Sequence, residues 1–368
     1  MTSSATRPVA FDRNRLRLAR ELKGWTKQRL ADAADVTPAA ISQYESGANK
    51  PGRAILATMA LALGMPQGFF NAGRPTAQAN SDTAHFRSLR STSLRDRRKA
   101  LTYATFAWEI TGELEKRVKL PKLVLPSAVV SETAARNDIE ALAVSCRHAL
   151  GIQSGPVPNV VRLLEANGVV VVRLPMACRE VDAFSCTLEG RPIVLLSDDK
   201  NDKARSRHDA AHELGHLVMH DDVDPGSQLV ERQANNFAAS FLMPAEEIGS
   251  QLPTRLDWSQ LIDLKMEWGV SLASLLYRSK TLGIISDSTY RRGFTSLNSR
   301  RGPDGATWRV SEPGDLGPPE QPLLLRKSLE LLDAEGIGIE SLSNQLELPA
   351  DIVRHLVGSD DRPSVDLS

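Results

Sequence analysis

The sequence predicts a multi-domain protein with an N-terminal all-α bundle, a central α+β domain and a small C-terminal helical unit. One observation is length, because 368 residues exceed the usual size of a single domain and match two or three. Capped amphipathic patterns over residues 10–72 predict the bundle, and strands followed by helices after residue 121 predict the α+β domain. We place the domains at 1–75 for the bundle, 76–120 for a basic linker and connecting helix, 121–295 for the central domain, and 296–368 for a second linker and the helical unit.

Four helices are expected in the bundle. The first spans about 12–22, and the second begins after Thr26, a good N-cap. A short turn leads to a third helix that opens at Thr37 with Pro38 in the first position, where a missing N–H loses no hydrogen bond. Residues 53–65 supply the fourth helix.

Hydrophobic spacing and turn residues define the elements that follow the bundle. Residues 73–100 are polar and basic, as in a linker. Helices are expected at 99–119, 138–152, 157–167, 207–220 and 229–244, a buried β-branched strand at 168–175, two strands within 182–199, an extended loop at 296–322, and three or more short helices within 323–358.

Composition and charge limit the class of protein. Hydrophobic residues at 41% and the lack of a long apolar run predict a soluble chain with no membrane partner. The N-terminus has no apolar signal segment, and three cysteines (Cys146, Cys178 and Cys186) suit a reducing compartment, so a cytoplasmic location is expected. Residues 1–120 carry 20 Lys+Arg against 10 Asp+Glu, while the remainder is acidic. A basic first third predicts a polyanionic partner.

Four of the seven histidines recur at four-residue spacing, at His208, His212, His216 and His220. On a helix such positions drift by about 40° each, so only neighbours in this series can share one metal ion. Glu213 selects the pair, because His212, Glu213 and His216 form the HExxH pattern, in which the histidines bind the ion and the glutamate acts as base. His208 and His220 are expected to be bystanders.

A catalytic metal of this kind needs a third protein ligand and an open position. Asp222 lies six residues after His216, but Met219 stands where a helix-ending glycine would be needed to fold the chain back. Glu231 lies at the border of the apolar stripe on the next helix, and Asn235, one turn later, is placed to orient a ligand. The pattern favours Glu231 and leaves Asp222 as the alternative.

The expected cofactor is Zn²⁺, with Mn²⁺ as a second choice. The ion would lower the pKa of a bound water molecule and polarise an amide carbonyl. Glu213 would accept a proton from that water and pass it to the leaving amine. His220, Arg205 and Arg207 are close in sequence as donors to an oxyanion, and nothing in the pattern selects one.

The stretches AAHELGHLVMH and ERQANNFAASFLMP resemble the ImmA/IrrE-type metallopeptidases over roughly residues 125–250. The resemblance implies a zincin-like, gluzincin-type fold with His212, His216 and Glu231 as metal ligands and Glu213 as catalytic base. It supports Glu231 over Asp222. Some members cleave phage or stress-response repressors that carry a helix-turn-helix.

The segment GWTKQRLADAADVTPAAISQYESGANKPG resembles the Xre/Cro-type helix-turn-helix, in which the third helix enters the DNA major groove. Lys27 stands where a glutamine is frequent. The resemblance implies a double-stranded DNA operator as partner and pairing of half-sites by a homodimer. The expected DNA contacts are Pro38, Ala39, Ala40, Ser42 and Gln43 toward base edges, and Thr26, Lys27, Thr37, Asn49 and Lys50 around them or at phosphates.

The leading hypothesis is a DNA-binding transcriptional regulator fused to a zinc endopeptidase that acts on itself or on a partner repressor. The basic stretch at 85–99 is a solvated linker, an extension of the DNA contact, or a segment that the peptidase grips or cuts. The acidic C-terminal unit has a helix-turn-helix outline but is expected to serve packing or dimerisation. Two alternatives remain, a transcription factor with a non-catalytic ligand or metal sensor and an antitoxin-like repressor that binds a protein partner.

Overall fold

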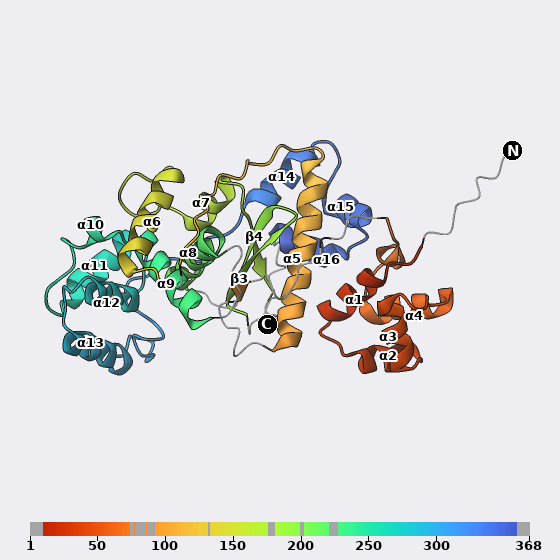
Figure 1. The fold of residues 1–368 in the computed structure, drawn as a ribbon, viewed down its shortest axis with the longest axis horizontal. Helices are drawn as coiled ribbons and strands as arrows, with labels where there is room; N and C mark the ends of the chain where they lie inside the picture. Colours follow the sequence, from red (N-terminus) through yellow and green to blue (C-terminus); the bar gives the residue numbers. More distant parts are fainter. Residues whose placement is uncertain are drawn as a thin grey trace.

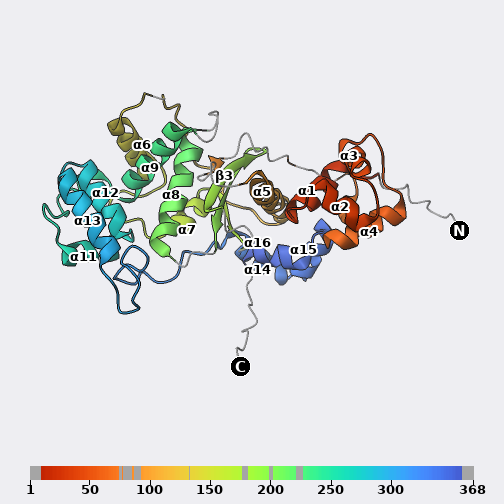
Figure 2. The same ribbon diagram turned by 90° about the horizontal axis from the view of Figure 1, so that it is seen from below.

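The computed structural model describes residues 10–73, 77, 85–86, 93–131, 133–175, 181–198, 202–220 and 227–358. The molecule is elongated, with a helical bundle at one end, a small sheet near the middle and a second group of helices at the other end (Figures 1 and 2). The multi-domain architecture predicted from the sequence is confirmed.

The N-terminal bundle contains α1 (Arg13–Leu22), α2 (Lys27–Ala34), α3 (Pro38–Ser46), α4 (Arg53–Leu63) and the short 3-10 helix η1 (Gln67–Phe70). The hydroxyl of Thr26 accepts the N–H of Arg29, and that of Thr37 accepts the N–H of Ala40, so both threonines cap their helices as predicted. Gly47 ends α3 in the left-handed conformation with φ 78°. The bundle is therefore specified by local signals at the ends of its helices.

A long helix, α5 (Leu94–Glu115), joins the bundle to the centre of the molecule. It begins earlier than the predicted residue 99 because Ser93 caps it, accepting the N–H of Asp96. Phe106 of α5 packs edge-to-face on Phe69 of η1, with ring centroids 5.9 Å apart. The bundle thus packs directly on α5.

The sheet has four strands in the order β1-β3-β4-β2. The strands are β1 (His85–Phe86), β2 (Val170–Leu174), β3 (Ala183–Leu188) and β4 (Arg191–Ser197). β2 pairs parallel with β4, whereas β3 pairs antiparallel with both β4 and β1. The strand predicted at 168–175 and the two strands predicted within 182–199 are confirmed as β2, β3 and β4.

The sheet separates two hydrophobic cores. Alternate residues of β2 point to opposite faces, so Val170 and Val172 join the core that includes α5 and the N-terminal bundle, while Val171 joins the other core. Because both faces are covered, all five residues of β2 are buried.

Within the described part of the chain, eight helices contribute to the core that contains Val171, and one of them carries His212 and His216. They are α6 (Arg136–Ala149), α7 (Val160–Ala166), α8 (Lys203–Met219), α9 (Gln228–Leu242), α10 (Ala245–Ile248), α11 (Trp258–Trp268), α12 (Leu272–Thr281) and α13 (Asp287–Ser299). Helix α8 packs against α9 and against β3 and β4, so it lies between the sheet and the outer helices (Figure 2).

The C-terminal unit consists of α14 (Leu324–Asp333), α15 (Ile339–Leu346) and α16 (Ala350–Val357). These helices lie on the opposite face of the sheet, beside α5 (Figure 1). His355 Nε2 lies 3.0 Å from the carbonyl oxygen of Arg173 in β2. The expected packing role of this unit agrees with its burial against α5 and the sheet. Among the described residues, no helix combines the length and hydropathy needed to cross a bilayer.

Candidate metal centre

Helix α8 carries His208, His212 and His216, with His220 as its C-cap residue, and α8 packs against α9. His212 and His216 have no exposed surface. Gly215, between them, lies against Phe237 of α9, and a Cβ at this position would come within 3.0 Å of the phenyl ring. The glycine therefore allows α9 to approach the histidines closely enough to supply a further ligand.

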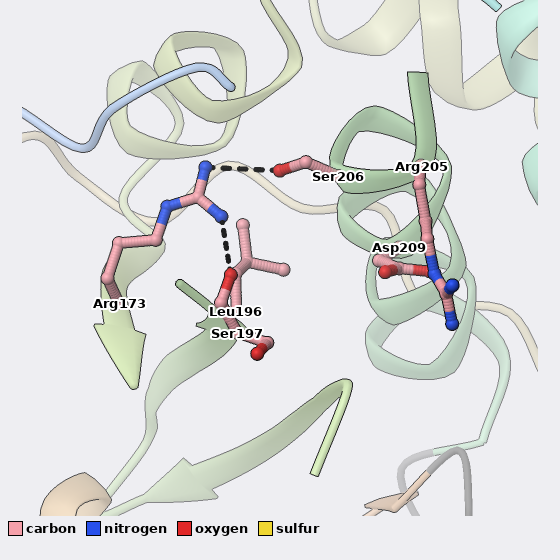
Figure 3. A pocket seen from close by; sticks show the side chains of 6 residues that line it. All are labelled: Arg173, Leu196, Ser197, Arg205, Ser206 and Asp209. Carbon is pink, nitrogen blue, oxygen red and sulfur yellow. Dashed lines mark hydrogen bonds between the residues drawn. The ribbon is translucent and has the colours of Figure 1, made fainter. Parts of the chain in front are cut away.

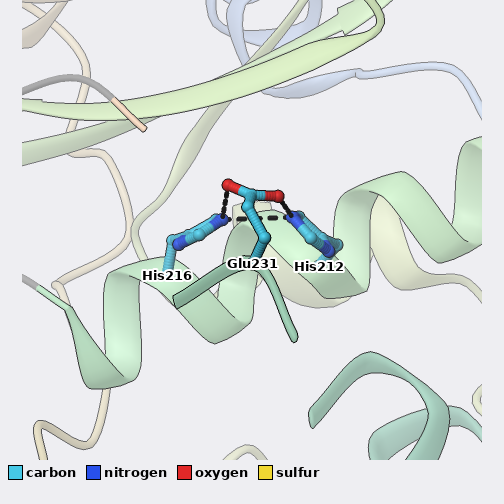
Figure 4. Close-up of side chains that lie close together, drawn as sticks. All are labelled: His212, His216 and Glu231. Carbon is cyan, nitrogen blue, oxygen red and sulfur yellow. Dashed lines mark hydrogen bonds and ion pairs between the residues drawn. The ribbon is translucent and has the colours of Figure 1, made fainter. Parts of the chain in front are cut away.

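Three side chains from α8 and α9 converge on one point (Figure 4). His212 Nε2 lies 3.1 Å from His216 Nε2, and the Glu231 carboxylate lies 3.3 Å from the first and 3.5 Å from the second. A tetrahedral zinc ion with bonds of about 2.0–2.1 Å separates its ligand atoms by about 3.3 Å. The donor set and its spacing therefore fit one zinc ion.

Burial and hydrogen bonding set the protonation states of this group. Desolvation by burial lowers the pKa of His216 to about 4, although Glu231 acts in the opposite direction. Burial raises the pKa of Glu231, but the neighbouring imidazoles of His212 and His216 together outweigh it and hold the pKa at about 2. At neutral pH the group thus offers a neutral imidazole and an ionised carboxylate, the forms that bind metal ions.

Glu213, which follows His212 on α8, is buried and contacts the sheet. It has no exposed surface, and its Oε2 accepts a hydrogen bond of 2.7 Å from Ser185 Oγ on β3. The next residue, Cys186, has its pKa raised to about 12 by burial, with Glu213 adding to the effect, so its thiol stays protonated at neutral pH. Ser185 was not among the predicted site residues, because only the tertiary fold brings β3 to α8.

His220 is not the bystander that the sequence suggested. It is 1% exposed, and its Nδ1 lies 3.1 Å from His216 Nδ1, on the side away from Glu231. Its Nε2 lies 3.0 Å from Gln233 Oε1 on α9. Helical spacing places His220 beside His216, but no pattern in the sequence around His220 predicts its contact with Gln233 of α9. His208 is half-buried, with its ring centroid 6.3 Å from that of His212, and lies outside the converging group.

Two further residues were predicted at this site, Asn235 to orient a ligand and Asp222 as the alternative third ligand. Asn235 Nδ2 donates to the backbone carbonyl of Glu231 at 2.8 Å, so it contacts the main chain of that residue instead of the carboxylate. Asp222 lies outside the described residues.

The arginines considered as oxyanion donors are engaged elsewhere. Arg205 Nη2 lies 3.2 Å from Asp182, and the buried Arg207 pairs with the buried carboxylate of Glu320. Glu320 also accepts the N–H groups of Val160 and Val161 at the start of α7. Arg207 therefore fastens the loop before α14 to the α7–α8 layer.

A small hollow near the start of α8 is lined by none of the three converging residues (Figure 3). Its lining residues are Arg173, Leu196, Ser197, Arg205, Ser206 and Asp209. Arg173 donates to Ser206 Oγ at 3.0 Å and to the Ser197 carbonyl at 3.1 Å, so this hollow is crossed by structural hydrogen bonds.

The predicted DNA contacts lie on α2, α3 and the turn after α3. Gln43 is exposed, whereas Ala40 packs partly against the bundle core, which limits its reach toward a base. Lys27 Nζ lies 3.2 Å from Ser42 Oγ and 3.7 Å from Glu45. The exposed members of the set are Thr26, Lys27, Thr37, Ala39, Gln43, Asn49 and Lys50, and the half-buried members are Pro38, Ala40 and Ser42.

The N-terminal bundle is of a type that binds DNA, and the α+β region with its converging side chains is metallopeptidase-like. Comparison with protein families agrees with both halves. Residues 16–66 match the helix-turn-helix family, and residues 164–280 match the IrrE N-terminal-like domain. No curated protein matches the chain. The fusion indicated by the sequence motifs is confirmed, and the chain has the domain composition of a regulator with a peptidase-family domain.

Proposed function

We propose that the protein is a DNA-binding transcriptional regulator whose IrrE-like domain is a zinc-dependent endopeptidase. The observation that carries this proposal is the convergence of His212, His216 and Glu231 within 4.8 Å, on a pair of helices of which α8 also carries the buried carboxylate of Glu213. A site that only senses a metal needs the three ligands but has no use for a buried carboxylate directly after the first of them in the helix. Glu213 therefore favours hydrolysis over sensing.

The side chains divide the work of peptide hydrolysis. His212, His216 and Glu231 would hold zinc, which, when bound, lowers the pKa of a water molecule and polarises the substrate carbonyl. Glu213 accepts the proton of the attacking water and later delivers it to the leaving amine. Ser185 Oγ, at 2.7 Å from Oε2, orients the Glu213 carboxylate for both transfers. Burial of Glu213 strengthens its electrostatic effect on the attacking water.

The bundle would bring this activity to DNA. The exposed Gln43 on α3 would read adenine through two hydrogen bonds, and the exposed Lys27 and Lys50 would contact phosphates. Binding of paired half-sites by two copies of the chain is part of the same proposal.

The pairing of β1 favours the linker of this chain as one substrate. His85 pairs with Ser185 and Phe86 with Phe184, so the backbone of 85–86 adds to the edge of β3 next to the residue that orients Glu213. Peptides recognised through such an added strand are bound in extended form. Cleavage near this segment would separate the DNA-binding bundle from the rest of the chain.

The test compares the wild-type chain with Glu213→Gln after incubation with zinc, alone and with helix-turn-helix repressors, by intact-mass spectrometry. Glu246→Gln, a matched change at an exposed residue of α10, is the control. We expect fragments of the chain cut between residues 73 and 93, or fragments of a repressor, in the wild type and the control and none in Glu213→Gln. Zinc binding with no Glu213-dependent fragment of any protein would refute the peptidase and leave the sensor.

A further inference from the structure

A chain of three hydrogen bonds runs from His216 into the scaffold behind the metal centre. His216 Nδ1 lies 3.1 Å from His220 Nδ1, His220 Nε2 lies 3.0 Å from Gln233 Oε1, and Gln233 Nε2 donates to the carbonyl of Ser131 at 2.9 Å. His220 and Gln233 are 1% and 5% exposed. Three separate segments therefore meet in this chain, at the end of α8, in α9 and in the stretch before α6.

The far end of the chain fixes the direction of every proton. A backbone carbonyl only accepts, so the amide nitrogen of Gln233 must face Ser131 and its oxygen must face His220. That oxygen also only accepts, so neutral His220 carries its proton on Nε2 and leaves Nδ1 as an acceptor. His216 must then donate from Nδ1, which leaves the lone pair of its Nε2 directed at Glu231 and His212.

We propose that His220 and Gln233 are positioning residues that hold His216 in the Nδ1–H tautomer, so that its Nε2 is a metal ligand before any ion arrives. The proposal rests on the metal centre of the proposed function and deepens it. Free imidazoles favour neither the orientation nor the tautomer that a metal requires, and partners behind a ligand supply both.

Ser131, where this series of hydrogen bonds ends, lies in a stretch that is itself tied to α8. Ala128 N–H donates to the carbonyl of Val218 at 2.9 Å, which ties the stretch containing Ser131 to the last turn of the histidine helix. The backbone N–H of His220 donates to the carbonyl of His216 at 2.9 Å, so His220 stays in register with the ligand that it positions. The His220 ring, which accepts the hydrogen bond from His216, is thus held through Gln233 and Ser131 and also through its own backbone.

The first test uses Gln233→Met, which keeps the volume of the side chain and removes both hydrogen bonds. Gln228→Met, an exposed residue on the same helix, is the matched control. In the metal-free chain labelled with ¹⁵N-histidine, we expect NMR to report the Nδ1–H tautomer at His216 in the wild type and the control, and a mixture in Gln233→Met. Zinc affinity, measured by competition with a chromophoric chelator, should fall about 10–100-fold in Gln233→Met alone.

A second pair of variants covers the case in which Gln233→Met does not fold. His220→Asn retains an acceptor oxygen near the position of Nδ1 and should keep the tautomer, whereas His220→Leu should lose it. Equal tautomer populations in His220→Asn and His220→Leu would overturn the proposal, as would an unchanged tautomer in a folded Gln233→Met. A chain that binds no zinc but shows the Gln233-dependent tautomer would refute the proposed function and leave the positioning role standing.

Discussion

Replacement of Glu109 by alanine tests whether a buried ion pair docks the N-terminal bundle on α5. Arg15 Nη1 lies 2.8 Å from the Glu109 carboxylate, and the two side chains are 0% and 4% exposed. The Arg15 guanidinium also lies 5.1 Å from the centre of the Phe69 ring. Removal of one partner of a buried pair leaves an uncompensated charge and costs about 3–5 kcal/mol. We expect Glu109→Ala to lower the opening free energy of α1 and η1 by about that amount.

Hydrogen exchange followed by mass spectrometry measures this opening directly. A change of about 3 kcal/mol accelerates exchange about 100-fold in peptides that cover α1 and η1. Glu113→Ala is the control, because Glu113 of α5 pairs with the more exposed Lys116 and Arg117 just after the helix, an arrangement worth about 0–1 kcal/mol. Equal acceleration by the two substitutions would refute the docking role of the buried pair.

A double substitution separates charge burial from packing. Arg15→Met combined with Glu109→Leu removes both charges and keeps apolar volume, so it should restore most of the protection that Glu109→Ala loses. Protection as low as that of Glu109→Ala would mean that the hydrogen bond itself holds the bundle in place.

Three further predictions concern the metal centre, the DNA surface and pH. Glu231→Gln should weaken zinc binding by at least about 100-fold in a chelator competition, and Glu246→Gln should not; equal affinities would exclude Glu231 as a ligand. Gln43→Ala should cost about 1–3 kcal/mol of operator binding and relax base preference, whereas Lys50→Ala should weaken binding to all sequences and flatten its salt dependence. Burial raises the pKa of Glu165 from 4.5 to about 7, even though the carboxylate accepts N–H groups at the start of α14. Its stability contribution is therefore complete below pH 4.5 and is lost as pH rises through about 7, by up to about 3 kcal/mol, so urea unfolding at pH 5 and pH 8 should differ less in Glu165→Gln than in the wild type.

Features governed by local sequence could be predicted well. Thr26 and Thr37 are caps because a hydroxyl before a helical run accepts a free N–H, whatever lies further along the chain. The same locality makes His212, Glu213 and His216 recognisable, since one helix sets their spacing. Glu231 could also be predicted as a ligand, because its position at the border of an apolar stripe directs it toward α8.

Features that depend on the meeting of distant segments could not be predicted. Ser185 reaches Glu213, and Gln233 reaches His220, only after the sheet, α8 and α9 have packed together. The ion pair of Arg15 with Glu109 joins residues on two separate helices, and nothing near either residue indicates it. The early start of α5 also differs from the sequence expectation, because its first turns lack apolar spacing and depend on the cap at Ser93.

X-ray absorption spectroscopy of the 368-residue chain loaded with one equivalent of zinc tests most directly whether His212, His216 and Glu231 hold the ion. The account predicts nitrogen and oxygen donors at about 2.0–2.1 Å, with outer scattering from two imidazoles. Burial keeps the pKa of the Cys146 and Cys186 thiols at about 12, which agrees with a centre that has no sulfur ligand. A sulfur shell at about 2.3 Å, or scattering from fewer than two imidazoles, would contradict the account.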